Sequence, residues 1–204
     1  GGAYAGTEKQ QICLSYSYGD GKESSCENTV NSVQRLFYNI PINTYFSLDL
    51  DGISALNDSV GGVDVVSPET IGEFVEGESY HLVGQQALSF VRTRDTSKTD
   101  SNNMRMQRQK VYIQSFMNTV LQQTKKDLTT PIDLFNASAP YSCTNLNPSK
   151  VSYLVQQAVL GGMNGIDMVS VPGQVTMGSK YAEFNVSEAE FYQLFLSIYY
   201  TKIE

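Results

Sequence analysis

Arginine, a side chain suited to binding phosphate, is concentrated in one short part of this 204-residue chain. Four of its five arginines are Arg92, Arg94, Arg105 and Arg108. The stretch from Arg92 to Lys110 holds six basic and two acidic residues, whereas the whole chain has a net charge of −7. Guanidinium groups present several donors in a fixed fork, which matches phosphate or pyrophosphate oxygens. The cluster therefore predicts an anion site, and the alternative is a solvated basic face.

A long helix, expected over about 103–126, would position part of this cluster. Arg105 and Gln109 are spaced four residues apart and lead into an apolar stripe, so they are expected on the face of that stripe. An arginine on a core-facing line needs an anionic partner, and a helix N-terminus favours negative charge. The pattern predicts a pocket with a cationic mouth and an apolar floor, while Arg108 is expected off this line as a surface or ion-pair residue. The stripe consists of Ile113, Phe116, Met117, Val120 and Leu121.

The other two arginines precede this helix. Arg92 and Arg94 are two residues apart, so an extended backbone would point both side chains the same way. A polar loop, 95–102, separates them from Arg105. Because the loop is short, Arg92, Arg94 and Arg105 are expected to converge on one anion.

Composition and charge narrow the class of protein. The chain is 41% hydrophobic and 17% charged, which is ordinary for a globular protein, and its length fits one domain over 1–204. No stretch approaches the ~18 apolar residues of a membrane span. The acidic balance argues against nucleic-acid binding, which depends on neutralising phosphates over a broad surface.

Helical and strand patterns alternate along the sequence, which predicts a layered α/β domain. Residues 67–83 read as an acidic loop, and capping residues mark several helix starts. Strands are expected near 45–50, 63–66 and 166–171. Helices are expected near 8–18, 24–37, 53–60, 87–91, 103–126 and 147–160, and from Ser187 onward.

The cysteines and the single histidine give weaker signals. Cys13, Cys26 and Cys143 are an odd number without metal-type spacing, so one disulfide plus a free thiol and three reduced thiols both remain open. His81 stands alone in a polar stretch and is expected to be a loop or surface residue rather than a catalytic one.

Several motifs in order along the chain resemble the LytR-CpsA-Psr family. Phe-Val-Arg-Thr-Arg-Asp at 90–95, followed by Arg-Met-Gln-Arg-Gln at 105–109, is similar to the signature of that family. The segments 45–53, 56–65 and 81–88 resemble further family landmarks, as do 14–19 and 171–173. Linked motifs at family spacing are far more specific than a single Arg-Thr-Arg.

The resemblance implies a layered α-β-α fold with a central mixed sheet. It also implies a membrane-anchored, extracytoplasmic enzyme of Gram-positive cell-wall assembly. Such a phosphotransferase moves an anionic glycopolymer (teichoic acid, capsule or similar) from an undecaprenyl-pyrophosphate carrier to peptidoglycan. Its pyrophosphate-binding residues would match Arg92, Arg94, Arg105 and Gln109, with Arg92 and Arg94 catalytic. The lipid would lie along Ile113, Phe116, Met117 and Val120.

Two departures from the family pattern qualify this expectation. The Ser-Ile-Pro-Arg-Asp motif and the aspartate-bearing strand before it, which supply the usual Mg²⁺ ligands, are absent from residues 1–204. We therefore expect a chain that lacks the first strands and the metal ligands of the domain, and is inactive by itself. Asn102 also stands where the family often has aspartate, and the nearby Asp100 is a candidate to take its place. The further candidate site residues are Asp95, Asp100, Asn102 and Arg108. The alternative function is a non-catalytic polyprenyl-phosphate or wall-polymer binding protein.

Overall fold

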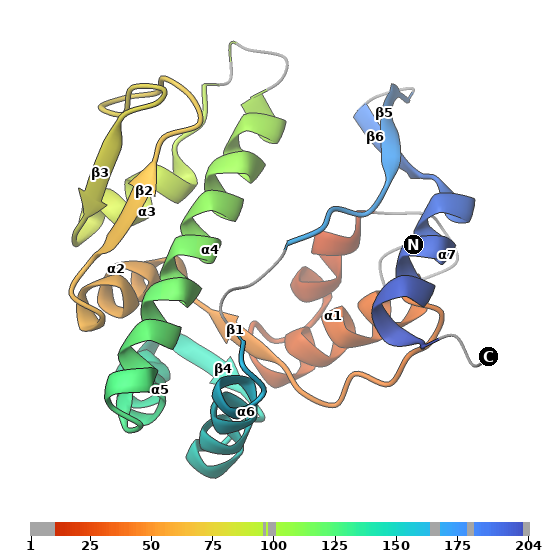
Figure 1. Cartoon of the computed structure of the whole chain (residues 1–204). Coiled ribbons are helices and arrows are strands. Elements are labelled where there is room, and N and C mark those ends of the chain that lie inside the picture. The colour runs from red at the N-terminus through yellow and green to blue at the C-terminus, as the bar shows by residue number, and fades with distance from the viewer. Residues whose placement is uncertain (1–10, 96, 98–100, 164–167, 179–181, 202–204) are drawn as a thin grey trace. The chain divides into compact units, whose positions relative to one another are not determined.

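A computed structural model describes residues 11–95, 97, 101–163, 168–178 and 182–201. The chain divides into two compact units, Gly1–Asp167 and Met168–Glu204, and each is described by itself. Asp100 lies outside the described residues, as do parts of the helix expected near 8–18 and of the strand expected near 166–171. In the first unit (Figure 1) the elements are η1 (Ile12–Tyr18), α1 (Glu23–Leu36), β1 (Phe46–Leu48), α2 (Leu50–Ser59), β2 (Val63–Val66), β3 (Ser79–Leu82), α3 (Gln85–Arg92), α4 (Ser101–Lys126), α5 (Thr130–Ser138), η2 (Ala139–Tyr141), β4 (Ser142–Thr144) and α6 (Pro148–Leu160).

The core of the first unit forms where β2 and β3 meet α3 and α4. Along β2, Val63 and Val65 are buried and their neighbours are exposed, the alternation of a half-buried strand. Phe74, from the loop before β3, packs edge-on against Phe90 of α3, with ring centroids 5.1 Å apart. Tyr112 and Val120 bring α4 into the same cluster. The β2–β3 pair and α3 thus pack against α4 in one core, which holds α3 and α4 beside each other.

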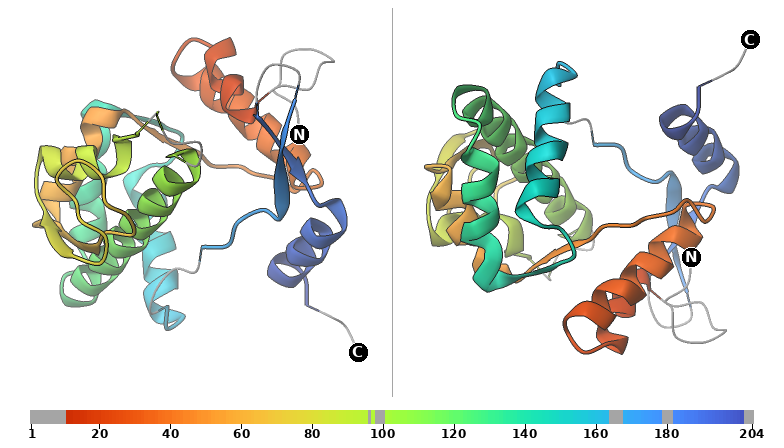
Figure 2. Two further views of the ribbon diagram at one scale, coloured as in Figure 1. Left: turned by 90° about the horizontal axis from the view of Figure 1, so that it is seen from above. Right: turned by 90° about the horizontal axis from the view of Figure 1, so that it is seen from below.

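Helix α4 is the longest element and runs alongside β2 (Figure 1). The expected helix over 103–126 is confirmed. Helices α5 and α6 lie side by side, as the right-hand view in Figure 2, from below, shows. Asn147 caps α6 by accepting a hydrogen bond from the Lys150 backbone at 2.9 Å, and Pro148 is the first helical residue, as the sequence predicted.

The second unit contains a hairpin and one helix. Strands β5 (Gly173–Met177) and β6 (Ala182–Val186) pair antiparallel, and α7 (Glu188–Tyr199) follows Ser187. The prediction of a strand near 166–171 was wrong for residues 168–171, the part that the structure describes. The first described strand of this unit, β5, begins at Gly173. The predicted helix start at Ser187 is confirmed, although its side chain makes no capping hydrogen bond.

The α/β class is confirmed, and the sheet is less continuous than expected. The strands of the described residues form three separate antiparallel pairs, β1–β4, β2–β3 and β5–β6, instead of one mixed sheet. Part of the region read as an acidic loop is β3, which pairs with β2 in the register Val63 to Leu82. This strand escapes a pattern search because it is only four residues long and mostly exposed. No described helix is long and apolar enough to cross a membrane.

Candidate functional site

The candidate site lies at the junction between the end of α3 and the start of α4 (Figure 1). Arg92 is the last residue of α3, and Arg94 follows the C-cap residue Thr93. Arg94 Nε donates a hydrogen bond to Oγ of Ser101 at 3.0 Å. Ser101 is buried at the first turn of α4. This bond draws Arg94 to the helix N-terminus, where the backbone also favours an anion.

Arg105 and Gln109 extend the junction along the first turns of α4. The half-buried Arg105 donates from Nη2 to Asn102 Oδ1 at 2.9 Å. Gln109 is exposed, and its Nε2 donates to the carbonyl of Val91 in α3 at 3.2 Å. Asn102, where the family often has aspartate, therefore orients Arg105 without neutralising it.

Arg108 is the arginine that enters the protein interior. Its side chain is 1% exposed and forms an ion pair with Glu69, a residue of the loop between β2 and β3. Its Nε donates to the Phe90 carbonyl at 2.8 Å, and Nη2 donates to the Thr93 carbonyl. Burial lowers the pKa of Arg108 from its ordinary value. Arg108, a residue of α4, thus binds the C-terminal end of α3, where Arg92 and Arg94 lie.

The predicted inner face of α4 was wrong in its first half. Arg105 and Gln109 were expected on the core-facing line, but the buried line runs through Arg108 and Tyr112. Continuing in steps of four, it reaches the half-buried Phe116, then Val120 and Thr124. The physical reason is that the Glu69 carboxylate and the carbonyls of Phe90 and Thr93 compensate the buried guanidinium of Arg108. Arg105 and Gln109 are left nearer to solvent.

The four apolar residues expected along a lipid do not share one environment. Ile113 is 44% exposed, whereas Phe116 and Met117 are half-buried. Val120 is a core residue with 8% exposure, so the structure assigns it to packing rather than to a lipid-facing surface. Phe116 stacks on Tyr112 with a centroid separation of 6.1 Å.

Charge compensation separates the four arginines into two kinds. Arg108 has its carboxylate, Glu69. Within the described part of the chain, no ion pair engages Arg92, Arg94 or Arg105. Arg92, Arg94 and Arg105 thus differ from the buried Arg108, whose charge is compensated within the fold. That the three bind one anion stays a prediction. Sequence reasoning missed both Glu69 and Ser101. Glu69 is one of four glutamates in the loop over 67–83, so no local signal distinguished it.

Acidic side chains do not assemble into a metal centre among the residues that the structure describes. No group of three or more His, Cys, Asp or Glu side chains there could hold a metal ion. Asp95 instead accepts hydrogen bonds from the backbone and hydroxyl of Ser97. The described residues therefore offer no such cluster of ligands for Mg²⁺.

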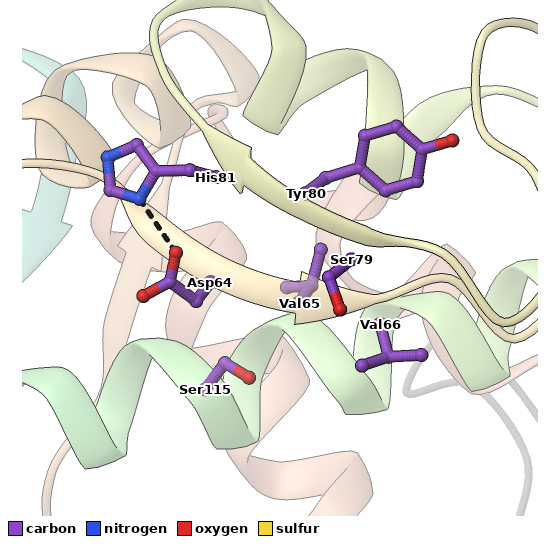
Figure 3. A pocket seen from close by; sticks show the side chains of 7 residues that line it. All are labelled: Asp64, Val65, Val66, Ser79, Tyr80, His81 and Ser115. Carbon is purple, nitrogen blue, oxygen red and sulfur yellow. Dashed lines mark hydrogen bonds and ion pairs between the residues drawn. The ribbon is translucent and has the colours of Figure 1, made fainter.

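A separate hollow of about 310 Å³ lies over β2 and β3, away from the arginines (Figure 3). His81 forms part of its wall, where Nδ1 lies 2.8 Å from Asp64 Oδ1 and Nε2 lies 3.0 Å from the Gly61 carbonyl. The neighbouring Gly62 has φ of +97°, and a β-carbon there would lie 2.4 Å from His81 Nε2. His81 is an exposed strand residue, so its predicted surface position is confirmed.

The contact between His81 and Asp64 predicts that part of the folding stability depends on pH. Asp64 raises the pKa of His81, because the carboxylate accepts a hydrogen bond from the imidazolium, and the Gly61 carbonyl adds to the effect. The stabilisation is fully present below the unfolded pKa of about 6.5 and is lost as the pH rises through the higher folded pKa. A proton NMR titration of the single histidine should give a pKa above 6.5 in the native chain and a lower one in Asp64→Asn. Equal values in the two proteins would contradict the assignment.

The chain belongs to the LytR_cpsA_psr family, whose family model matches residues 2–196. This match spans both compact units. It agrees with the resemblance seen in the sequence motifs around Arg92, Arg94 and Arg105.

Curated relatives carry transferase names. The chain is 27% identical over 173 residues to the polyisoprenyl-teichoic acid–peptidoglycan teichoic acid transferase TagU of Bacillus cereus, covering 81% of this chain and 52% of the relative. It is 35% identical over 101 residues to TagV of Bacillus subtilis, covering 44% of this chain and 24% of TagV. The chain thus spans about half or less of the length of these relatives.

Solved structures show the same fold. The structure of B. subtilis TagV aligns with a TM-score of 0.76 at 22% identity, covering 97% of this chain and 78% of TagV. A structure of TagT bound to LI-WTA aligns with a TM-score of 0.70 at 14% identity, covering 96% and 72% of the two chains. At these identities the likeness establishes the fold, and the ligand belongs to TagT.

Proposed function

We propose that this chain is part of a phosphotransferase that attaches an anionic glycopolymer to peptidoglycan. The observation that carries the proposal is the set of three arginines at the junction of α3 and α4 that have no carboxylate partner among the described residues. The family membership and the names of the curated relatives support it. The substrate would be a polymer linked to undecaprenyl pyrophosphate.

In this proposal each junction residue has a separate task. Arg92, Arg94 and Arg105 bind the pyrophosphate oxygens, and Gln109 donates beside them. An acceptor hydroxyl on peptidoglycan attacks the phosphorus that carries the polymer, the bond from that phosphorus to the lipid phosphate oxygen breaks, and polyprenyl phosphate leaves. Arg92 and Arg94 stabilise the charge that develops on the leaving phosphate. The apolar residues Ile113, Phe116 and Met117 are proposed contacts of the lipid.

The location and metal requirement belong to the same proposal. A polyprenyl carrier and a peptidoglycan acceptor imply an extracytoplasmic protein held at the membrane, through a segment outside residues 1–204. The family resemblance implies a Mg²⁺ requirement. We also propose that residues 1–204 alone bind the lipid-linked polymer without turnover, because the Ser-Ile-Pro-Arg-Asp motif is absent from them.

The test is a transfer assay with a labelled polymer on undecaprenyl pyrophosphate and with purified peptidoglycan. A protein that contains both this chain and the Ser-Ile-Pro-Arg-Asp motif should incorporate label and release polyprenyl phosphate, and a chelator should stop both. Residues 1–204 alone should retain the lipid-linked polymer without transfer. Binding in both proteins without transfer in either would reject the enzyme proposal.

That last outcome corresponds to the alternative function, a non-catalytic protein that binds polyprenyl phosphate or wall polymer. The observation favouring it is Asn102, whose amide oxygen accepts a hydrogen bond from Arg105 at a position where the family often has a carboxylate. An amide cannot accept the proton of an attacking hydroxyl as a carboxylate does. If transfer is found, Asn102→Asp tests this point directly, and a rise in its rate would indicate that the asparagine limits catalysis.

A further inference from the structure

Two of the three cysteines lie on elements of the first unit that contact each other, α1 and β4. Cys26, in α1, is 3% exposed, and Cys143 is the half-buried central residue of β4. Cys143 lies directly opposite Ser47 of β1 in the strand register. Residues directly opposite in an antiparallel pair point to the same face, so Cys143 shares the face of Ser47. Cys26 and Ser47 line the same hollow, which places the Cys26 thiol on that face. All three cysteines are free thiols in the structure, and Cys13 is exposed on η1.

We propose that Cys26 and Cys143 form a disulfide that fastens α1 to the β1–β4 pair. Close approach of the two side chains is the geometric condition for such a bond. The sequence left the pairing open, and the fold supplies it by bringing together residues that are far apart in the chain. The proposal is independent of the function proposed above.

The position of α1 gives this bond a mechanical role. Among its stronger contacts, α1 meets η1, which precedes it in the chain, and β4, which is distant in sequence. Contact with β4 is thus a principal attachment of the N-terminal helices to the rest of the first unit. A covalent link there closes a long loop, and long loops gain the most from closure because the unfolded chain loses the most freedom.

The surroundings indicate how the bond forms. Cys26 lines a hollow of about 260 Å³, together with Thr29, Val30 and Val33 of its own helix. Burial and the neighbouring Cys143 raise the pKa of the Cys26 thiol to about 11, so Cys26 is a thiol at neutral pH. The half-buried Cys143 is therefore the site of first attack.

The chemistry needs an exogenous disulfide as the oxidant, either a small molecule or a thiol–disulfide oxidoreductase. Cys143 loses its proton to solvent and attacks one sulfur of that disulfide, which releases the first exogenous thiol. Cys26 then loses its proton and attacks Cys143 Sγ, which releases the second. Two protein thiols are oxidised and one exogenous disulfide is reduced. Because Cys26 must deprotonate, ring closure should accelerate roughly tenfold per pH unit between about 7 and 9.

The test uses the whole 1–204 chain, reduced and then exposed to oxidised glutathione, with free thiols trapped by alkylation. Wild type and the control Cys13→Ser should each lose two alkylatable thiols and give a linked peptide joining Cys26 to Cys143. Cys143→Ser should give no such peptide. Reduction should lower the melting temperature of the oxidised wild type and of Cys13→Ser by about 10 °C.

Two results would overturn the proposal. One is a linked peptide that contains Cys13, or that joins two molecules, in place of the expected pair. The other is full alkylation of Cys26 and Cys143 in folded Cys13→Ser after prolonged oxidation at pH about 9. If Cys143→Ser does not fold, the linked peptide and the number of alkylated thiols in wild type and Cys13→Ser are sufficient to test the proposal.

Discussion

Replacing Arg94 by alanine is expected to lower polymer transfer about 100- to 1000-fold in a protein that contains this chain and transfers polymer. Arg94 is exposed, carries no ion pair among the described residues, and is directed to the N-terminus of α4 by its bond to Ser101. Its guanidinium would meet the charge that appears on the leaving phosphate. The loss should therefore appear in kcat. The measurement is the initial rate of label incorporation at saturating lipid-linked polymer.

Controls separate this catalytic role from general effects. Arg94→Lys keeps the charge and loses the fork, so it should fall between wild type and Arg94→Ala. Lys126→Ala removes an exposed cation at the far end of α4 and should leave the rate unchanged. The unfolding free energy of Arg94→Ala should stay within about 1 kcal/mol of wild type, because the residue is exposed. An Arg94→Ala protein that transfers at the wild-type rate would remove Arg94 from the proposed site.

Replacing Arg108 by methionine is expected to destabilise the fold by about 3 to 5 kcal/mol. The substitution leaves Glu69 buried without a partner, since its side chain is only 10% exposed, and it leaves the Phe90 and Thr93 carbonyls without this donor. Denaturant unfolding followed by circular dichroism measures the change. A loss below about 1 kcal/mol would show that the pair does not hold α3 to α4.

The matched double variant, Arg108→Met with Glu69→Met, distinguishes a lost ion pair from lost packing. Because both charges disappear together, the double variant should recover a large part of the stability lost by Arg108→Met. If the double variant is as unstable as the sum of the two single variants, the two side chains act independently. In either single variant, we expect the end of α3 to loosen, and transfer to fall with it through Arg92 and Arg94.

The sequence was most informative where the pattern is local. The helical spacing in 103–126, the Asn147–Pro148 cap and the family motifs around Arg94 each depend on residues a few positions apart, and the structure has these helices at the predicted places. Short elements were harder. Helix α5 was not predicted, and β6 was missed although its apolar residues Ala182, Phe184 and Val186 alternate with polar ones. Strand β3 is held largely by pairing with β2.

The face of α4 shows why part of the site could not be predicted. The apolar stripe from Ile113 onward predicted an inner line through Arg105 and Gln109. The actual inner line runs through Arg108 because its charge is compensated by Glu69 and by the carbonyls of Phe90 and Thr93, none of which is on α4. Tyr112, four residues after Arg108, was the local sign of this line. Long-range compensation of a buried charge has no period in the sequence, so only the fold reveals which arginine is structural.

The central claim is that Arg92, Arg94 and Arg105 hold a pyrophosphate head, and calorimetric titration tests it most directly. The probe is undecaprenyl pyrophosphate in detergent micelles, added to the 1–204 chain, to Lys126→Ala, and to the triple variant Arg92→Ala, Arg94→Ala, Arg105→Ala. We predict equal affinity for the first two proteins and at least a 100-fold weaker affinity, roughly, for the triple variant. A folded triple variant that binds the probe as tightly as the wild type would contradict the claim.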